Sequence, residues 1–82
     1  METDPRLFLT CDAFRGVHYE PIVDLLSTIC GVHSGKFGVR KGYHASFCSI
    51  YCDAETAAQI FEQRTNLSFQ GKKCFMRPWD RR

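Results

Sequence analysis

The chain has 82 residues and a mass of 9.5 kDa, the size of one small domain, which excludes a two-domain organisation. With 44% hydrophobic residues and a net charge of +2, it has too much apolar surface and too little charge for a disordered chain. No apolar run approaches the roughly 20 residues of a membrane span, and the acidic start is unlike a secretory signal. We therefore expect a soluble intracellular protein, in the nucleus, the cytoplasm or an organelle, with no membrane partner.

The cysteines argue against a disulfide framework and against a metal site. Their number is odd, no two form a C-x-x-C pair, and no histidine stands at the short spacing of a structural zinc site. Free cysteine behaves as a small hydrophobic residue and is commonly buried. We therefore expect no metal and five reduced, buried thiols, at Cys11, Cys30, Cys48, Cys52 and Cys74.

Residues 6–11 show the alternation of a half-buried strand. Leu7, Leu9 and Cys11 fall on one face, and Phe8 falls on the opposite face. A large aromatic side chain on the polar side of a strand is unusual. Phe8 is therefore the first candidate for a functional residue.

Residues 12–17 contain Gly16 and predict a loop, after which a helix begins. Pro21 suits the first turn of a helix, and Gly31 can take the left-handed conformation that ends one. Between them, apolar residues recur at helical spacing, at Ile22, Leu25, Leu26 and Ile29.

Residues 34–51 predict a β-hairpin that turns at Lys41-Gly42, with Arg40 opposite Tyr43. Residues directly opposite in an antiparallel pair share a face, so the pattern sorts the side chains into two sets. The inward set comprises Phe37, Val39, Cys48 and Ile50. The outward set comprises Lys36, Arg40, Tyr43, Ala45, Phe47, Ser49 and Tyr51. A slip by one residue would exchange the two sets.

A second helix is predicted after Asp53, whose side chain can cap its N-terminus, with an end near Arg64. Residues 72–77 predict a last strand with Cys74 inward and Phe75 and Arg77 outward. The order βαββαβ predicts an α+β fold of the ferredoxin-like type, with a four-stranded antiparallel sheet and two helices on one face. We expect the domain over residues 6–79, an N-terminal extension over 1–5 and a basic tail over 80–82.

The outward face of this sheet would combine aromatic rings with cations. Flat rings can stack on unpaired bases, and Lys or Arg beside them can pair with phosphates. The acidic residues, by contrast, lie mainly on the predicted helices. The predicted binding residues are Phe8, Lys36, Arg40, Lys41, Tyr43, Phe47, Phe75 and Arg77, with Tyr51 as a further ring on this face.

From Leu7 to Trp79 the chain resembles the RNA recognition motif family. Leu7-Phe8-Leu9 is similar to its first conserved strand element, and Lys41-Gly42-Tyr43 followed by Phe47 resembles the second. Residues 44–46 depart from the second element, where a small residue and another ring are expected. Counting back from Ala57 gives a different alignment of that element, with Tyr51 and Cys48 at ring positions.

The resemblance implies a monomeric module that binds single-stranded RNA on its sheet, with no cofactor and no reaction. Members of the family also bind proteins, so a docking module in an RNA-processing assembly, contacting a partner through the sheet or the acidic helical face, is the alternative. An acylphosphatase-like enzyme of the same fold is disfavoured, because the only asparagine, Asn66, follows the second helix. Trp79 either packs over the sheet edge or stacks on a base.

Overall fold

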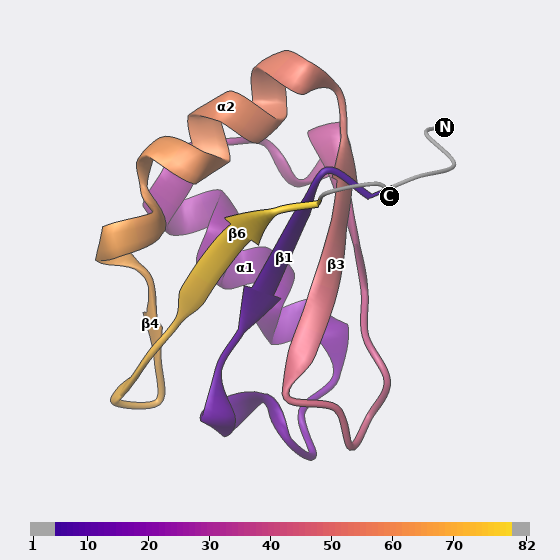
Figure 1. The fold of residues 1–82 in the computed structure, drawn as a ribbon, viewed down its shortest axis with the longest axis vertical. Coiled ribbons are helices and arrows are strands. Elements are labelled where there is room, and N and C mark those ends of the chain that lie inside the picture. Colours follow the sequence, from indigo (N-terminus) through magenta and orange to yellow (C-terminus); the bar gives the residue numbers. More distant parts are fainter. Residues whose placement is uncertain (1–4, 80–82) are drawn as a thin grey trace.

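The computed structural model describes residues 5–79, which form an α+β fold (Figure 1). Three short 3₁₀ segments, η1 (Asp12–Phe14), η2 (Ser34–Lys36) and η3 (Arg64–Asn66), join the larger elements. In chain order the helices and strands are β1 (Leu7–Thr10), α1 (Tyr19–Cys30), β2 (Phe37–Arg40), β3 (Phe47–Cys52), α2 (Ala54–Glu62), β4 (Ser68–Phe69), β5 (Lys72–Lys73) and β6 (Phe75–Pro78).

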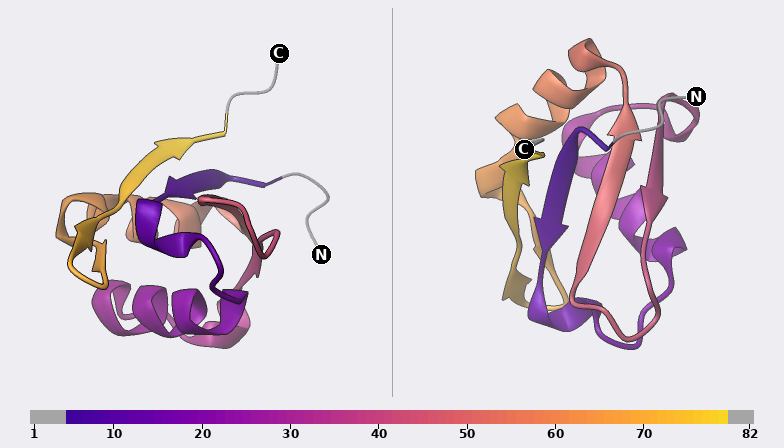
Figure 2. Two further views of the ribbon diagram at one scale, coloured as in Figure 1. Left: turned by 90° about the horizontal axis from the view of Figure 1, so that it is seen from below. Right: turned by 45° about the vertical axis from the view of Figure 1, so that its right-hand side comes forward.

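Four strands form one antiparallel sheet in the order β2-β3-β1-β6, and β4 and β5 pair separately as a small hairpin. Both helices cover the same face of the four-stranded sheet, as the side-on view in Figure 2 shows, and no helix or strand of residues 5–79 covers the other face. The α+β class, the two helices and the four-stranded antiparallel sheet expected from the sequence are confirmed. Neither helix within residues 5–79 has the length and apolar run that crossing a membrane requires.

The helix ends follow the local signals in the sequence. Asp53 caps α2 as predicted, since its Oδ1 accepts a hydrogen bond from the backbone N–H of Thr56 at 2.8 Å. Gly31 ends α1 with φ 68°, and its N–H donates to the carbonyl of Ser27 at 3.1 Å. The buried stripe of α1 differs from the expected one. Ile29 remains 39% exposed, and the stripe instead consists of Ile22, Leu26 and Cys30.

The core lies between the helices and the inward face of the sheet. The inward side chains of the strands alternate along each strand as predicted and are buried, at Leu7, Leu9, Phe37, Cys48, Ile50 and Cys52. Five buried residues lie outside the helices and strands, at Cys11, Phe14, Val32, Leu67 and Cys74. Phe14 in η1 is fully buried and meets the ring of Phe69 edge-on, with centroids 5.4 Å apart, and Leu67 is buried just before β4.

The predicted two-residue turn of the hairpin is wrong, although the assignment of faces is right. Arg40 pairs with Ser49 and not with Tyr43, and residues 41–46 form the connection. The connection is longer because it bonds to the first loop: the N–H of Gly16 donates to the Tyr43 carbonyl and that of Cys11 to the Ser46 carbonyl. The observed register differs from the predicted one by six positions, an even number, so the side chains within β2 and β3 keep their predicted faces.

The predicted last strand is two strands. Gln70 and Gly71 both have positive φ, 50° and 78°, which is the backbone of a tight two-residue hairpin turn between β4 and β5. Cys74 separates β5 from β6, and β6 pairs with β1. Cys74 is buried and Phe75 exposed, as predicted. Pro78 is tolerated in β6 because that strand is an edge of the sheet.

All five cysteines are buried, and none of them is in a disulfide. Burial raises the pKa of Cys48 from 9.0 to about 12, and the Lys41 charge opposes that rise in part. Burial, together with the hydrogen bond and charge of the neighbouring Cys11, raises the pKa of Cys74 to about 12.

We expect stability to fall as the pH rises above about 9. The unfolded chain releases the Cys48 proton near pH 9.0, whereas the folded chain holds it until about 12, so alkaline conditions favour unfolding within that window. Cys48 alone contributes a slope of about 1.4 kcal/mol per pH unit there. Urea unfolding at several pH values measures the slope. The Cys48→Ala variant should lose that share, and an unchanged slope in this variant contradicts the assignment.

Candidate functional site

The open face of the sheet is the candidate site, and we call it the outer face. The pairing registers place its side chains in rows across the strands. Phe8 on β1 lies in the central row, between Ser49 on β3 and Arg77 on β6, and Arg40 on β2 continues that row. The adjacent row consists of Phe47, Thr10 and Phe75, and the row on the other side includes Gly38 and Tyr51.

Three phenylalanine rings therefore lie on three adjacent strands. Phe47 is 50% exposed and Phe75 63% exposed, while Phe8 is partly buried. Phe8 is a diagonal neighbour of both others, at a Cα separation of about 8 Å given the usual strand spacing and rise. The residue directly opposite Phe8 is Ser49, not a ring. The surface is thus an open triangle of rings around Thr10.

Cations accompany these rings. The guanidinium carbon of Arg77 lies 5.8 Å from the Phe8 ring centroid, and Nζ of Lys73 lies 5.8 Å from that of Phe75. Both separations are within the range of cation–π attraction. None of the outward side chains of the four strands is acidic. The outer face therefore presents exposed π surface and positive charge together.

Two predicted site residues, Lys41 and Tyr43, lie off the sheet in the β2–β3 loop. The Tyr43 ring packs between the imidazoles of His18 and His44, at centroid distances of 4.9 and 5.1 Å. The Lys41 ammonium donates to the carbonyls of Gly42 and Tyr43. Partial desolvation lowers the pKa of Lys41, and Cys48 raises it in part. The placement of Tyr43 on a strand is therefore wrong, because the loop extends to residue 46, whereas Lys41 lies in the connection, as predicted.

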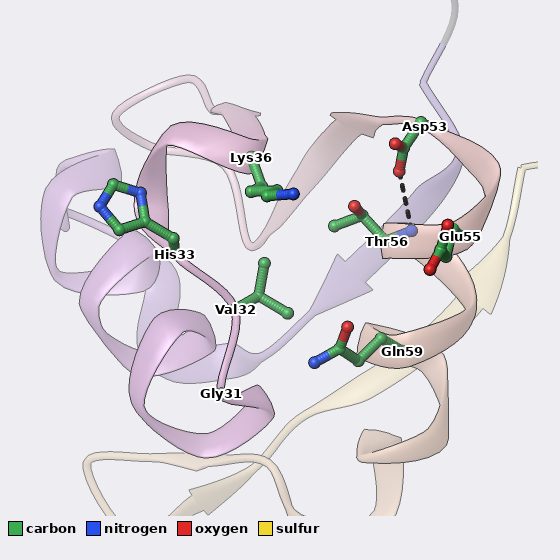
Figure 3. A pocket seen from close by; sticks show the side chains of 8 residues that line it. All are labelled: Gly31, Val32, His33, Lys36, Asp53, Glu55, Thr56 and Gln59. Carbon is green, nitrogen blue, oxygen red and sulfur yellow. Dashed lines mark hydrogen bonds between the residues drawn. The ribbon is translucent and has the colours of Figure 1, made fainter.

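Lys36 is also misplaced by the sequence interpretation. It lies in η2 and lines a half-open hollow of about 170 Å³ beside the start of α2, together with Asp53, Glu55 and Gln59 (Figure 3). The hydrogen bonds from Thr56 lower the pKa of Asp53, and the charge of Lys36 lowers it further. The sheet pairing begins only at Phe37, so Lys36 has no position on the outer face.

The prediction of the site omitted Arg6 and Lys73. Arg6 precedes β1, its N–H donates to the Ile50 carbonyl, and its Nε donates to the Cys52 carbonyl at 3.3 Å. The N–H of Trp79 donates to the Arg6 carbonyl, which extends the β1–β6 pairing by one position. The alternation of side chains along a strand could have identified both cations. Arg6 lies two residues before Phe8, and Lys73 lies two residues before Phe75, so each is expected on the same face as that ring.

Within residues 5–79, no cluster of three or more His, Cys, Asp or Glu side chains has an arrangement that could hold a metal ion. Comparisons with protein-family models, curated proteins and solved structures found no match to this chain. The outer face therefore has to be interpreted from its own chemistry.

Proposed function

We propose that this chain binds single-stranded RNA on its outer face, without catalysis, as a divergent member of the RNA recognition motif family. The observation that carries the proposal is the triangle of Phe8, Phe47 and Phe75 on adjacent strands, with Arg40 and Arg77 in the row of Phe8. Half-exposed rings on an open sheet have no packing role that explains them, whereas each can stack on one unpaired base.

The chain path supports the fold that this proposal requires. The antiparallel pairings make β1 and β2 parallel to each other with β3 between them, and they make β3 and β6 parallel with β1 between them. Each parallel pair is joined through one helix, which is the interleaving of a split βαβ plan. The β4–β5 hairpin is an insertion before the last strand of that plan.

Single-stranded RNA suits this surface better than a duplex does. A sheet face cannot enter the deep, narrow major groove of an A-form duplex, and stacking requires bases that are not already stacked. Stacking contributes about 1–3 kcal/mol per base, partly offset by the cost of ordering the strand, so we expect micromolar affinity. The proposal includes no catalytic step. An acylphosphatase-like reaction would need an asparagine on the sheet. Asn66 instead lies in η3, where its amide donates to Oε1 of Gln63 at 2.8 Å.

Titration with labelled RNA tests the proposal. A mixed-sequence single strand should bind at micromolar concentration and the matching duplex at least about tenfold more weakly. Equal affinities would contradict stacking on the sheet. Failure of both to bind would favour the alternative, a protein-docking module. That alternative has exposed apolar side chains of its own on α1, Tyr19 and Ile29, and the same helix carries Glu20 and Asp24.

We expect the two outer-face arginines to act through charge. Arg40→Ala or Arg77→Ala should lower RNA affinity more at low salt than at high salt, because each removes a phosphate contact and the counterion release that accompanies it. The slope of log K against log salt should decrease by about 0.7 for each substitution. Fluorescence anisotropy over a salt series measures this slope.

Lys36→Ala is the matched control for those two variants. It removes the same unit of charge from η2, beside α2, and should leave the slope unchanged. If all three variants reduce the slope equally, the attraction is a general effect of net charge, and the outer face is not the phosphate-binding surface.

A further inference from the structure

Gly38 lies within β2, where the fold does not need a glycine. Glycine inside a strand reduces stability because of its high entropy in the unfolded chain. Its φ is not positive, since the positive-φ glycines of the described chain are Gly16, Gly31 and Gly71. A Cβ built on Gly38 would meet no atom within 4 Å, so no close packing excludes a side chain either.

Gly38 also contributes no side chain to the outer face. Gly38 pairs with Tyr51 on β3, and Arg40 follows on the same face of β2. A ring from a neighbouring strand can pack over a strand glycine and so compensate for the missing side chain. The Tyr51 ring does not do so, because nothing approaches the Cβ position of Gly38. Gly38 is partly buried, but no atom of residues 5–79 occupies the space where its side chain would stand, beside Tyr51 and Arg40.

We propose that Gly38 keeps this part of the outer face clear for one nucleotide of a bound single strand. The base lies flat against the backbone of Gly38 beside Tyr51, and its phosphate is within reach of Arg40. Close approach of a ligand to the backbone is one of the uses of glycine in a strand. This inference rests on the proposed function, and it extends the binding surface from the phenylalanine triangle to the β2 edge of the sheet.

Two substitutions, Gly38→Ala and Gly38→Val, test it in the full chain. Both add a side chain in open space and suit a strand better than glycine, so each should raise the melting temperature by about 2–8 °C. Both should weaken binding of a labelled mixed-sequence single-stranded RNA of about ten nucleotides. The loss should increase with side-chain size and reach about 5- to 160-fold for valine, the equivalent of one lost stacked base. Stability and affinity thus change in opposite directions.

Gly42→Ala is the matched control. Its new Cβ would lie 3.8 Å from that of Ala45, an ordinary contact, and residue 42 is in the β2–β3 loop. Its RNA affinity should equal that of the wild type. If the wild type binds RNA and both Gly38 variants bind equally well, this inference fails while the proposed function stands. If the Gly38 variants melt at lower temperature, the glycine is structural and the inference fails. If the wild type does not bind the RNA, both proposals fail.

Discussion

The double substitution of Phe8 and Phe47 by alanine is expected to lower the affinity for single-stranded RNA by about 2–4 kcal/mol, or roughly 30- to 1,000-fold. Each ring offers a stacking surface on the outer face, and the two lie diagonally on neighbouring strands. We expect the double variant to lose less than the sum of two single losses of about 3 kcal/mol, because the effects of neighbouring residues that contact one ligand do not simply add. Anisotropy titration measures it, and the salt dependence should stay nearly constant because no charge is removed.

Tyr19→Ala provides the control for the double variant. Tyr19 is 51% exposed, almost the same as Phe47, but it lies at the start of α1 and not on the sheet. Its removal should leave RNA binding unchanged. Normal binding by the double variant would contradict the proposed stacking, as would an equal loss in Tyr19→Ala. Thermal melting should show that the double variant remains folded at the temperature of the titration.

The largest effect on stability is expected from Phe14→Ala, at about 3–5 kcal/mol. The ring is fully buried in η1 and packs edge-on against Phe69, so alanine leaves a cavity between the first loop and the β4–β5 hairpin. For a domain of this size, the melting temperature should fall by about 15–30 °C. Differential scanning calorimetry, with urea unfolding at a fixed temperature, measures both quantities.

Phe75→Ala is the matched control for Phe14→Ala. It deletes the same side chain from a position that is 63% exposed, so its cost should stay near 0.5 kcal/mol. If Phe14→Ala loses as little stability as Phe75→Ala, η1 does not belong to the core. A large loss in Phe75→Ala alone would mean that the outer face is covered in solution.

The parts of the fold that depend on local signals were predictable from the sequence. Asp53 and Gly31 mark helix ends through bonds to their own neighbours, so no distant residue had to be known. The two faces of the sheet follow from alternation, which remains valid for any even shift of register. For this reason Phe8 and Phe47 were assigned to the correct face although the hairpin turn was misplaced.

The parts that depend on contacts between distant segments could not be predicted. The length of the β2–β3 loop is set by its bonds to Gly16 and Cys11, and this loop removes Tyr43 from the sheet. Burial of Phe14 requires the ring of Phe69, which is 55 residues later in the chain. The glutamine at positive φ in the β4–β5 turn has no strong sequence signature, since asparagine and glycine are the usual residues there.

The segregation of charge between the two layers has a consequence for the speed of binding. The helices α1 and α2 carry four carboxylates and no Lys or Arg, whereas Arg40, Arg77 and Lys73 lie on or beside the sheet. The net charge is only +2, yet within these elements the negative charge lies on the helices and the positive charge lies on or beside the outer face. The electric field of a nearby polyanion would orient the protein so that the outer face points toward the polyanion before any contact forms. Added salt should therefore slow association more than it speeds dissociation.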